Sequence, residues 1–430
     1  MTGAGGRGLA ATGAIEPVGD ARRWTARATS VADIEKELSR IWGTVASESQ
    51  EAHLSTREAA VARGDPHLAG RLDEPGDVNV RMRTSVLTLV VVAERPETAE
   101  RALDAINELS SRHPSRALVI APGDPDGPAW MDAAIYAQCR VSERSRIETC
   151  TEQILIRTGG EMDAHLAELV EPLLIHDLPV VLWWPDDPPV ARHRFVTLLR
   201  TCDRLLVDSG AFSGDGLARL AGLAEVCAAG MPIVHDIGWM RLTLWRELLA
   251  ELFDHPLLAP ELATARTLRL DVLRPGAELR LAKPALYAGW LASVLGWEVT
   301  APLAPQRGRE TLVGAFRSAK GEVAIEIRPV EPGQEAGGRR AGSLARVEVE
   351  LGTRTHPVRA RVTRHPDHLL ATADWAGAEV ARRAGRREPF GEAPYVGEAL
   401  DRAGQDRMLA RAMASAVQLL GGSRAPANRG

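Results

Sequence analysis

Residues 85–121 read SVLTLVVVAERPETAERALDAINELSSRHPSRALVIA, and this stretch decides the fold. Its two ends, residues 85–93 and 116–121, are apolar and rich in β-branched residues, as strands covered on both faces are. The segment between them carries apolar residues at helical spacing, namely Ala99, Leu103, Ile106 and Leu109. A strand, a long helix and a second strand in this order predict a parallel sheet with helices on its faces.

The same alternation continues as far as residue 255. We predict further strands at residues 133–141, 147–158, 178–184, 204–208 and 232–237. We predict further helices at residues 161–174, 189–200, 216–229 and 239–253. Residues 133–141 and 147–158 are expected to form an antiparallel pair at a sheet edge, because the second alternates in polarity. The fold class is therefore α/β, with a Rossmann-like, mostly parallel sheet flanked by helices.

The chain changes character after residue 255. Residues 284–295 are expected to form a helix. Three later segments alternate strictly between apolar and polar residues, at 322–328, 346–351 and 358–363. This pattern predicts an antiparallel sheet with one wet face, and a helix over residues 396–420 is expected to pack on its dry face. The C-terminal part is thus an α+β domain with an antiparallel sheet.

The N-terminus offers weaker signals. Ser30 and Asp33 form a capping pair for a helix that we expect to end at Gly43. We divide the chain into a disordered tail, an N-terminal helical segment, the α/β domain, a linker, the C-terminal α+β domain and a second disordered tail. Their ranges are 1–29, 30–78, 79–255, 256–265, 266–421 and 422–430.

Composition excludes several classes of protein. Of the 430 residues, 45% are hydrophobic, which is enough for a sizeable core. A net charge of -5 argues against nucleic-acid binding, because phosphates require a clustered basic surface. The N-terminus has no secretory signal, and no apolar run approaches the ~20 residues needed to span a membrane. We therefore expect a cytoplasmic protein.

The cysteines and the basic residues are used unusually. We expect the four cysteines (Cys139, Cys150, Cys202 and Cys227) to be buried thiols, because none has CxxC spacing and all lie in or beside apolar segments. Only three of the 52 basic residues are lysine, which leaves 49 arginines, and the 10 tryptophans outnumber both Tyr and Phe. Arg and Trp are enriched at interface hot spots, so this usage favours binding.

Familiar catalytic motifs do not fit their surroundings. Residues 3–8 match GxGxxG, but they lie in a tail without the strand and helix that a dinucleotide site needs. Each lysine follows Glu or Ala, so there is no P-loop. His365 and His368 have HxxH spacing in an expected surface loop. We therefore predict no enzymatic activity, no cofactor and no metal.

Three segments at strand ends remain of interest. Residues 209–216 (SGAFSGDG) lead from a strand to a helix, where an open α/β sheet binds anions, or form a simple glycine-rich connection. Residues 183–189 (WWPDDPP) hold a carboxylate pair that suits either metal or acid/base chemistry, or helix capping. One of the two adjacent tryptophans can pack under a helix while the other reaches the rim. Residues 236–241 (DIGWMR) offer the same choice between catalysis and capping.

From these segments we predict a partner-binding surface. Its candidate residues are Trp183, Trp184, Asp186, Asp187, Asp236, Trp239, Arg241 and Trp245.

Six segments in this order resemble the OpcA-type glucose-6-phosphate dehydrogenase assembly proteins of actinobacteria and cyanobacteria. They are residues 83–93 (RTSVLTLVVVA), 113–120 (HPSRALVI), 148–156 (ETCTEQILI), 178–185 (LPVVLWWP), 204–209 (RLLVDS) and 236–249 (DIGWMRLTLWRELL). The likeness extends over about residues 30–420.

The resemblance implies a non-catalytic accessory protein of the oxidative pentose phosphate pathway. Such a protein is expected to bind glucose-6-phosphate dehydrogenase, favour its active oligomer and raise its affinity for substrate. The alternative is an enzyme or sensor that binds a sugar phosphate or a nucleotide at the strand-end loops.

Overall fold

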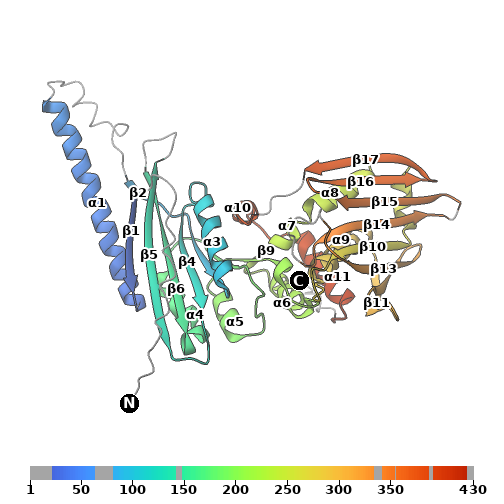
Figure 1. Ribbon diagram of the computed structural model, residues 1–430, viewed down its shortest axis with the longest axis horizontal. Coiled ribbons are helices and arrows are strands. Elements are labelled where there is room, and N and C mark those ends of the chain that lie inside the picture. Colours follow the sequence, from blue (N-terminus) through green and yellow to red (C-terminus); the bar gives the residue numbers. More distant parts are fainter. Residues whose placement is uncertain are drawn as a thin grey trace, which may run out of the picture.

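The computed structural model describes residues 22–62, 81–141, 148–333, 341–353, 355–386 and 391–423. Its two β-sheets lie at opposite ends of the molecule, with helices α6, α7, α9 and α11 between them (Figure 1). We call the nine-stranded N-terminal sheet sheet A and the eight-stranded C-terminal sheet sheet B. The predicted fold class is confirmed, because sheet A is mostly parallel and flanked by helices while sheet B is mostly antiparallel.

Sheet A has the strand order of dinucleotide-binding sheets. Its strands are β1 (Arg22–Ala28), β2 (Arg81–Arg83), β3 (Leu87–Val92), β4 (Ser115–Pro122), β5 (Trp130–Val141), β6 (Glu148–Gly159), β7 (Val180–Trp184), β8 (Arg204–Val207) and β9 (Ile233–Asp236). The spatial order β6-β4-β3-β7-β8-β9 is parallel throughout. Numbered along the chain, these six strands give 3-2-1-4-5-6, the Rossmann order, whose switch point lies between β3 and β7.

Helices cover both faces of sheet A and fill the space between the sheets. They are α1 (Val31–Ala62), α3 (Pro96–Leu109), α4 (Leu166–Val170), α5 (His193–Leu199), α6 (Leu217–Ala229), α7 (Ile237–Met240), α8 (Thr243–Leu252), α9 (Ala282–Leu295), α10 (Ala393–Asp401) and α11 (Arg407–Leu419). Their ends follow local chemistry: α3 begins with Pro96 at its first turn, and α6 ends at Gly230, whose φ is 82°.

Sheet B contains the three alternating strands that we predicted, at residues 322–328, 346–351 and 358–363, and five strands that we did not predict. The eight strands are β10 (Thr267–Leu273), β11 (Glu298–Pro305), β12 (Leu312–Ser318), β13 (Gly321–Val330), β14 (Leu344–Gly352), β15 (Pro357–Arg364), β16 (His368–Trp375) and β17 (Ala378–Arg386). Only β10 and β13 pair in parallel. The dry face carries residues such as Val349 and Val362, and the wet face carries an ion-pair network in which Arg269 contacts Glu326, Glu348 and Glu350.

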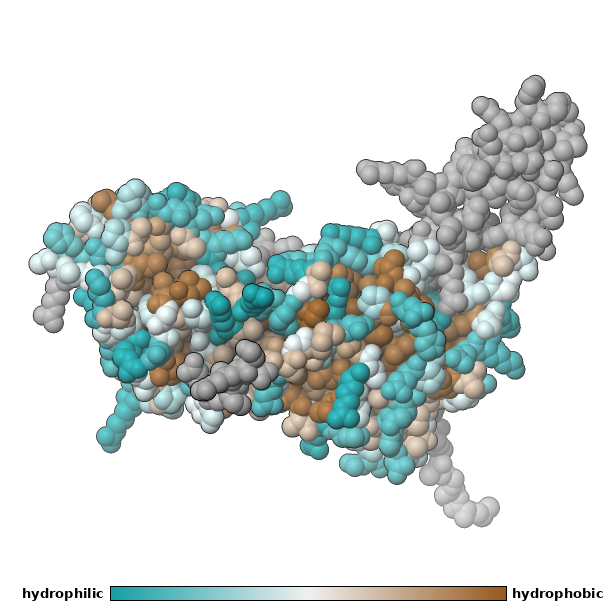
Figure 2. Space-filling view, turned by 180° about the vertical axis from the view of Figure 1, so that it is seen from behind, coloured by the Kyte–Doolittle hydropathy of each residue, from teal (hydrophilic) through white to brown (hydrophobic). Residues whose placement is uncertain are grey.

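Two hydrophobic clusters hold the molecule together. The larger joins one face of sheet A to the dry face of sheet B and includes Trp184, Trp245 and Tyr287. The smaller lies on the other face of sheet A, where Trp183 packs with α3 and α10. From behind, hydrophobic residues gather in patches near the middle of the molecule and are separated by hydrophilic ones (Figure 2). No helix in the described residues is both long and apolar enough to cross a bilayer.

The N-terminal prediction needs correction. Residues 22–28, which we expected in a disordered tail, form β1, whose Ala28 is buried against the core. β1 pairs with β5, so the predicted pair β5–β6 is antiparallel but does not end the sheet. Residues 1–21 and 424–430 lie outside the described residues. Ser30 caps α1 by accepting from Asp33 N (3.1 Å), but the helix continues past Gly43, since one exposed glycine costs only about 1 kcal/mol.

Three predicted helices are broken. Residues 161–174 form short helical turns around α4, and Pro172 lies in the last of them. Residues 239–253 divide into α7 and α8 after Arg241. Residues 396–420 divide into α10 and α11, because Asp406 caps a new helix by accepting from Met408 N at 2.9 Å.

The position predicted for the C-terminal helix is confirmed only in part. α8 packs on β15, β16 and β17 and α9 contacts β10, whereas α11 packs mainly on α9 and α6 and also contacts β11 at the edge of sheet B. α10 returns to the N-terminal domain and packs on α3. The C-terminal segment therefore ties the two domains together.

Candidate functional site

The switch point of sheet A is where a dinucleotide-binding protein holds its pyrophosphate, at the N-terminus of the helix after the first strand. Here that helix is α3, and the loop before it carries Glu94, Arg95 and Pro96 rather than a glycine-rich turn. The carboxyl ends of β3 and β7 meet at this point. Asp186 and Asp187, which follow β7, are therefore brought to the N-terminus of α3.

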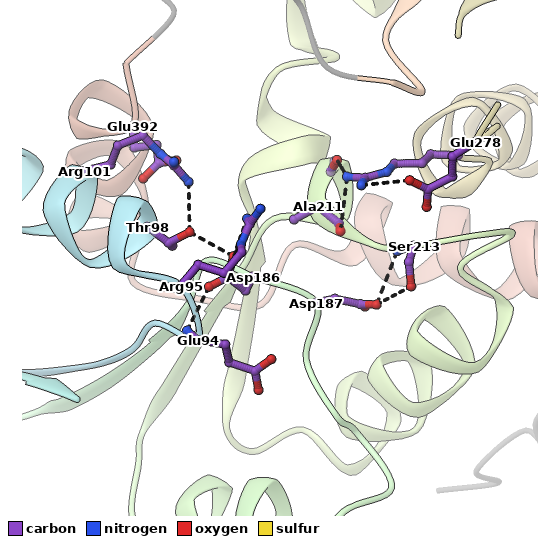
Figure 3. Close-up of polar contacts among 12 residues, drawn as sticks. Glu94, Arg95, Thr98, Arg101, Asp186, Asp187, Ala211, Ser213, Glu278 and Glu392 are labelled. Carbon is purple, nitrogen blue, oxygen red and sulfur yellow. Dashed lines mark hydrogen bonds and ion pairs between the residues drawn. The ribbon is translucent and has the colours of Figure 1, made fainter. Parts of the chain in front are cut away.

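Asp186 fills the anion position at this helix. Its carboxylate is 4% exposed and accepts from Glu94 N (2.9 Å), Arg95 Nε (2.9 Å) and Thr98 Oγ1 (2.9 Å). Figure 3 shows Asp186 between these three residues, with Arg101 linking Thr98 to Glu392 of the C-terminal segment. The capping role considered for this residue, at the helix that follows Pro189, is wrong, because Asp186 instead accepts from the loop before α3 and from the Thr98 side chain.

Asp187 binds the loop after β8 and helix α6, on the other side of the switch point from α3. It accepts from Ser213 Oγ (2.5 Å) and from Arg219 Nε (2.8 Å) and Nη2 (2.7 Å). Figure 3 shows its carboxylate turned toward Ser213 and away from Asp186. The two adjacent carboxylates thus point to different partners and do not form an acid/base or metal pair.

In the loop of residues 209–216, the backbone N–H groups of residues 209–214 all donate hydrogen bonds within the protein, so none of these six is available to a phosphate. Ser209 N donates to Asp236 Oδ1 (2.8 Å), Gly210 N to Asp208 Oδ1 (2.9 Å), and Gly214 N to Glu278 Oε1 (3.1 Å). The amides between them donate to Asp208 O, Ser209 O and Asp187 Oδ2. Because anion sites need free N–H groups, this geometry argues against a phosphate in the loop.

The same loop is covered by the C-terminal domain. Leu281 N donates to Gly214 O (3.2 Å), and a Cβ on Gly216 would lie 2.9 Å from Ala282 Cβ. Arg280 Nη1 reaches the carbonyls of Gly210 and Ala211, and the contact with Ala211 is drawn in Figure 3. The loop is an interface between the domains rather than an open cleft.

Two further carboxylates, Asp208 and Asp236, lie at the carboxyl ends of β8 and β9. Asp208, 2% exposed, forms an ion pair with Arg241 at 2.5 Å. Burial alone lowers the pKa of Arg241, but Asp208 outweighs this effect and raises it. Asp236 is fully buried and caps α7 by accepting from Gly238 N (2.8 Å), as we predicted for a strand end before a helix. Its burial raises the pKa of its carboxyl to about 6.

The predicted partner-binding residues are mostly buried. Trp183 and Trp184 are 0% exposed and lie on opposite faces of sheet A, so the expectation that one of them reaches the rim is wrong. Trp239 (2%) donates to Asp406 Oδ2 (2.8 Å), and Trp245 (1%) lies beneath Arg364. With Asp186 and Asp236 also buried, only Asp187 and Arg241 keep partial exposure, since the other side chains complete the core.

The cysteine prediction holds only in part. Cys202 and Cys227 are free, and burial raises the pKa of each thiol to about 12. Cys150 is disulfide-bonded, so the expectation of a buried thiol there is wrong. The side chain of Cys139, which is opposite Cys150 in the β5–β6 ladder, lies outside the described ones. His365 and His368 stack at 4.7 Å, and the described residues hold no group of three potential metal ligands.

Sequence reasoning missed two features of this edge. The first is the role of Asp186 at α3, which follows only from the adjacency of β3 and β7. The second is Trp130, which is 45% exposed at the start of β5. Its only signal was the Pro/Gly-rich stretch before it, which predicts a loop.

The fold and the edge define a class of protein: a two-domain chain with a Rossmann-like sheet whose usual ligand positions are filled by its own side chains. Residues 106–225 match the family described as glucose-6-phosphate dehydrogenase subunit N-terminal domain, and residues 232–413 match its C-terminal domain. The chain belongs to the family of OpcA-type glucose-6-phosphate dehydrogenase assembly proteins.

Curated relatives agree with this assignment. The "Putative OxPP cycle protein OpcA" of Nostoc punctiforme is 30% identical over 195 residues, which are 45% of this chain and 40% of that protein. The protein of the same name from Synechococcus elongatus is 28% identical over 194 residues, 45% of this chain and 42% of that protein. The matched region thus spans about two fifths of each relative.

A solved structure of the WlbA (WbpB) dehydrogenase from Thermus thermophilus, in complex with NAD and alpha-ketoglutarate, is 13% identical with a TM-score of 0.40. It covers 80% of this chain and 98% of that one. A similarity this low bears on neither fold nor function.

Proposed function

We propose that this chain is a non-catalytic, cytoplasmic accessory protein that binds glucose-6-phosphate dehydrogenase in the oxidative pentose phosphate pathway. It would promote the active oligomer of the dehydrogenase and raise its affinity for substrate. The main support for the proposal is the carboxyl edge of sheet A. There the side chains of Asp186, Asp208 and Asp236 accept from the backbone N–H groups that a ligand would need. Membership of the family supports glucose-6-phosphate dehydrogenase as the partner.

The mechanism is thermodynamic linkage. A protein that binds the active conformation of an enzyme more tightly than the inactive one shifts the population toward the active state, and only by that difference in affinity. A coupling free energy of about 1–3 kcal/mol changes apparent substrate affinity roughly 5- to 150-fold. No group of this chain needs to enter the active site of the dehydrogenase.

The test uses the full chain and the dehydrogenase of the same organism. Both are purified, mixed at micromolar concentration, and assayed for KM, kcat and oligomer size by light scattering. We expect a lower KM for glucose 6-phosphate and a larger oligomer in the mixture. Unchanged kinetics and unchanged size would overturn the proposal, and a complex that forms without altered kinetics would reduce the chain to a scaffold.

A second measurement addresses the alternative of a ligand-binding enzyme. The chain alone is heated with sugar phosphates and with nicotinamide cofactors, and its melting temperature is recorded. Because the amides of residues 209–214 are already paired, we expect no shift. A strong shift in the absence of the dehydrogenase would favour the ligand-binding reading instead.

A further inference from the structure

Trp130 is the most exposed tryptophan whose side chain the structure describes. It is 45% exposed, whereas the other described tryptophan side chains are buried or half-buried. It begins β5, at the same carboxyl edge of sheet A as the loops after β3 and β7, but beside β6. Tryptophan is one of the residue types that are enriched at interface hot spots.

The indole is held in one place by glycines. Trp130 is opposite Gly159 in the β5–β6 ladder, and a Cβ on Gly159 would lie 2.2 Å from the indole Nε1. A Cβ on Gly123 would lie 3.7 Å from the ring. Asp124 O accepts from Gly160 N (2.9 Å) and so ties the loop before Trp130 to the end of β6. A ring fixed before binding loses little conformational entropy when a partner covers it.

The sheet face that carries Trp130 is open at this end. Met131, Ala133 and Ile135 point into the core on the side that α1 covers. Trp130, Asp132 and Tyr136 alternate with them and lie on the other side. On that side Trp130 is exposed, Asp132 and Tyr136 are half-buried, and Ala134 is only 7% exposed. The accessible surface is therefore centred on the indole at the start of β5.

The loop before the indole is acidic, while the exposed Arg157 lies on the same sheet face, opposite Asp132 in the β5–β6 ladder. Residues 123–129 (GDPDGPA) contain Asp124 and Asp126 and no basic residue, and both carboxylates are exposed. Asp132 differs because it forms an ion pair with Arg27 at 2.8 Å. An aromatic face beside unneutralised carboxylates attracts a guanidinium or an ammonium group through cation–π and charge interactions.

We propose that Trp130, Asp124 and Asp126 form the docking point for an arginine or lysine on the surface of the dehydrogenase. This inference rests on the proposed function and specifies which surface of the chain performs it. The partner's basic side chain lies over the indole, and the two carboxylates fix its direction.

The experiment measures the Kd between the full chain and the native dehydrogenase for the wild type and three variants. Trp130→Ala is expected to weaken binding at least ~10-fold, as hot-spot residues do. The double change Asp124→Asn and Asp126→Asn is expected to weaken it several-fold and to reduce its dependence on salt. The side-chain oxygen of an asparagine can still accept the bond that Asp124 Oδ1 now receives from Asp126 N (3.0 Å), so the turn is kept.

Val294→Ala serves as the matched control, because Val294 is 55% exposed on α9 in the other domain. We expect wild-type Kd for this variant. Melting temperatures verify that all variants fold. Wild-type binding by both the Trp130 and the Asp124/Asp126 variants would overturn the docking point while leaving the proposed function intact. Failure of the wild-type chain to bind at all would overturn both. A wild-type dimer that Trp130→Ala dissociates would show self-association instead and would also overturn the docking point.

Discussion

The carboxyl edge of sheet A has two ends that differ in what they leave open. At β3, β7, β8 and β9, four aspartates accept the loop amides or pair with arginine, and the C-terminal domain covers the loops. At β4 and β6, the loop before β5 leaves an indole and two carboxylates exposed. The end at β3 and β7, where related sheet topologies bind ligands, is thus closed. The end at β4 and β6 is open. Side chains of the protein itself thus occupy the edge of a Rossmann-like sheet at which related topologies bind ligands.

The largest expected effect on stability follows removal of the buried ion pair at the closed end. Arg241→Ala leaves Asp208, 2% exposed, without its charged partner. We expect a loss of about 3 kcal/mol in the free energy of unfolding, since a buried charge is left uncompensated. Urea denaturation near neutral pH measures it. Arg219→Ala is the control, because its pair with Asp187 is partly exposed and should cost only about 1 kcal/mol or less. Equal losses would contradict the difference in burial.

The next effect concerns the filled anion position itself. Asp186→Ala removes the acceptor for Glu94 N and Thr98 Oγ1 and should cost about 2 kcal/mol. It also frees Glu94 N, the Arg95 guanidinium and Thr98 Oγ1 beside the N-terminus of α3, so inorganic phosphate should raise the melting temperature of the variant more than that of the wild type. Asp186→Asn, which keeps one acceptor, should respond less. A variant without any phosphate response would show that Asp186 does not occupy an anion site.

A change in the opposite direction is expected at Asp236. Burial raises the pKa of this carboxyl to about 6, above its ordinary value of 3.8, so the folded state holds the proton more tightly. That stabilisation is complete below about pH 3.8 and is lost as the pH rises through about 6, where the buried carboxylate becomes charged. Above pH 6 the ionised group is a cost to the fold.

Asp236→Asn should therefore raise the unfolding free energy by about 2 kcal/mol at neutral pH, with the gain shrinking toward pH 4. The Asn oxygen can accept from Ser209 N and Gly238 N as Asp236 Oδ1 does now. Its amide can donate to the buried Ser209 Oγ, which lies beside this carboxyl. Urea denaturation of both proteins at several pH values tests this, and a variant less stable than the wild type at neutral pH would contradict it.

The smallest effect on stability is expected at the open end. Gly159 has an extended φ of -159°, which alanine adopts freely, but its methyl group would meet the indole of Trp130. Gly159→Ala should change stability by about 1 kcal/mol or less and still weaken dehydrogenase binding, because the ring must turn away. Titration calorimetry with the dehydrogenase measures the second effect. Gly43→Ala, on an exposed helix position with open space, is the control and should bind normally.

Local patterns predicted most elements because their signals are local. The apolar run at β3, the helical spacing in α3 and the strict alternation in β14 and β15 each depend on neighbours a few residues away. β1 was missed because an arginine-rich segment forms a strand only when β5 offers a partner. The break before α11 was missed because its cause, Asp406, acts as a cap only in the folded geometry.

The sequence predicted which residues lie at the candidate site but not which partners most of them bind there. The aspartates at strand ends stand out in the sequence, and capping was correctly expected for Asp236. Two facts could not be read from the chain: β7 lies beside β3, and the C-terminal domain covers residues 209–216. Both join segments that are far apart in sequence. For this reason the tryptophans that suggested a surface proved to be core.

The sequence by itself determined the alternation of strands and helices over residues 85–255, the division into a parallel and an antiparallel sheet, and the family. These depend on periodicity and composition, which are properties of short segments. Only the tertiary structure decided which carboxylate meets which helix, which tryptophan stays exposed and which end of the sheet is open. Those outcomes depend on strand adjacency and domain packing, where residues such as Asp186 and Glu94, 92 positions apart, come within hydrogen-bonding distance.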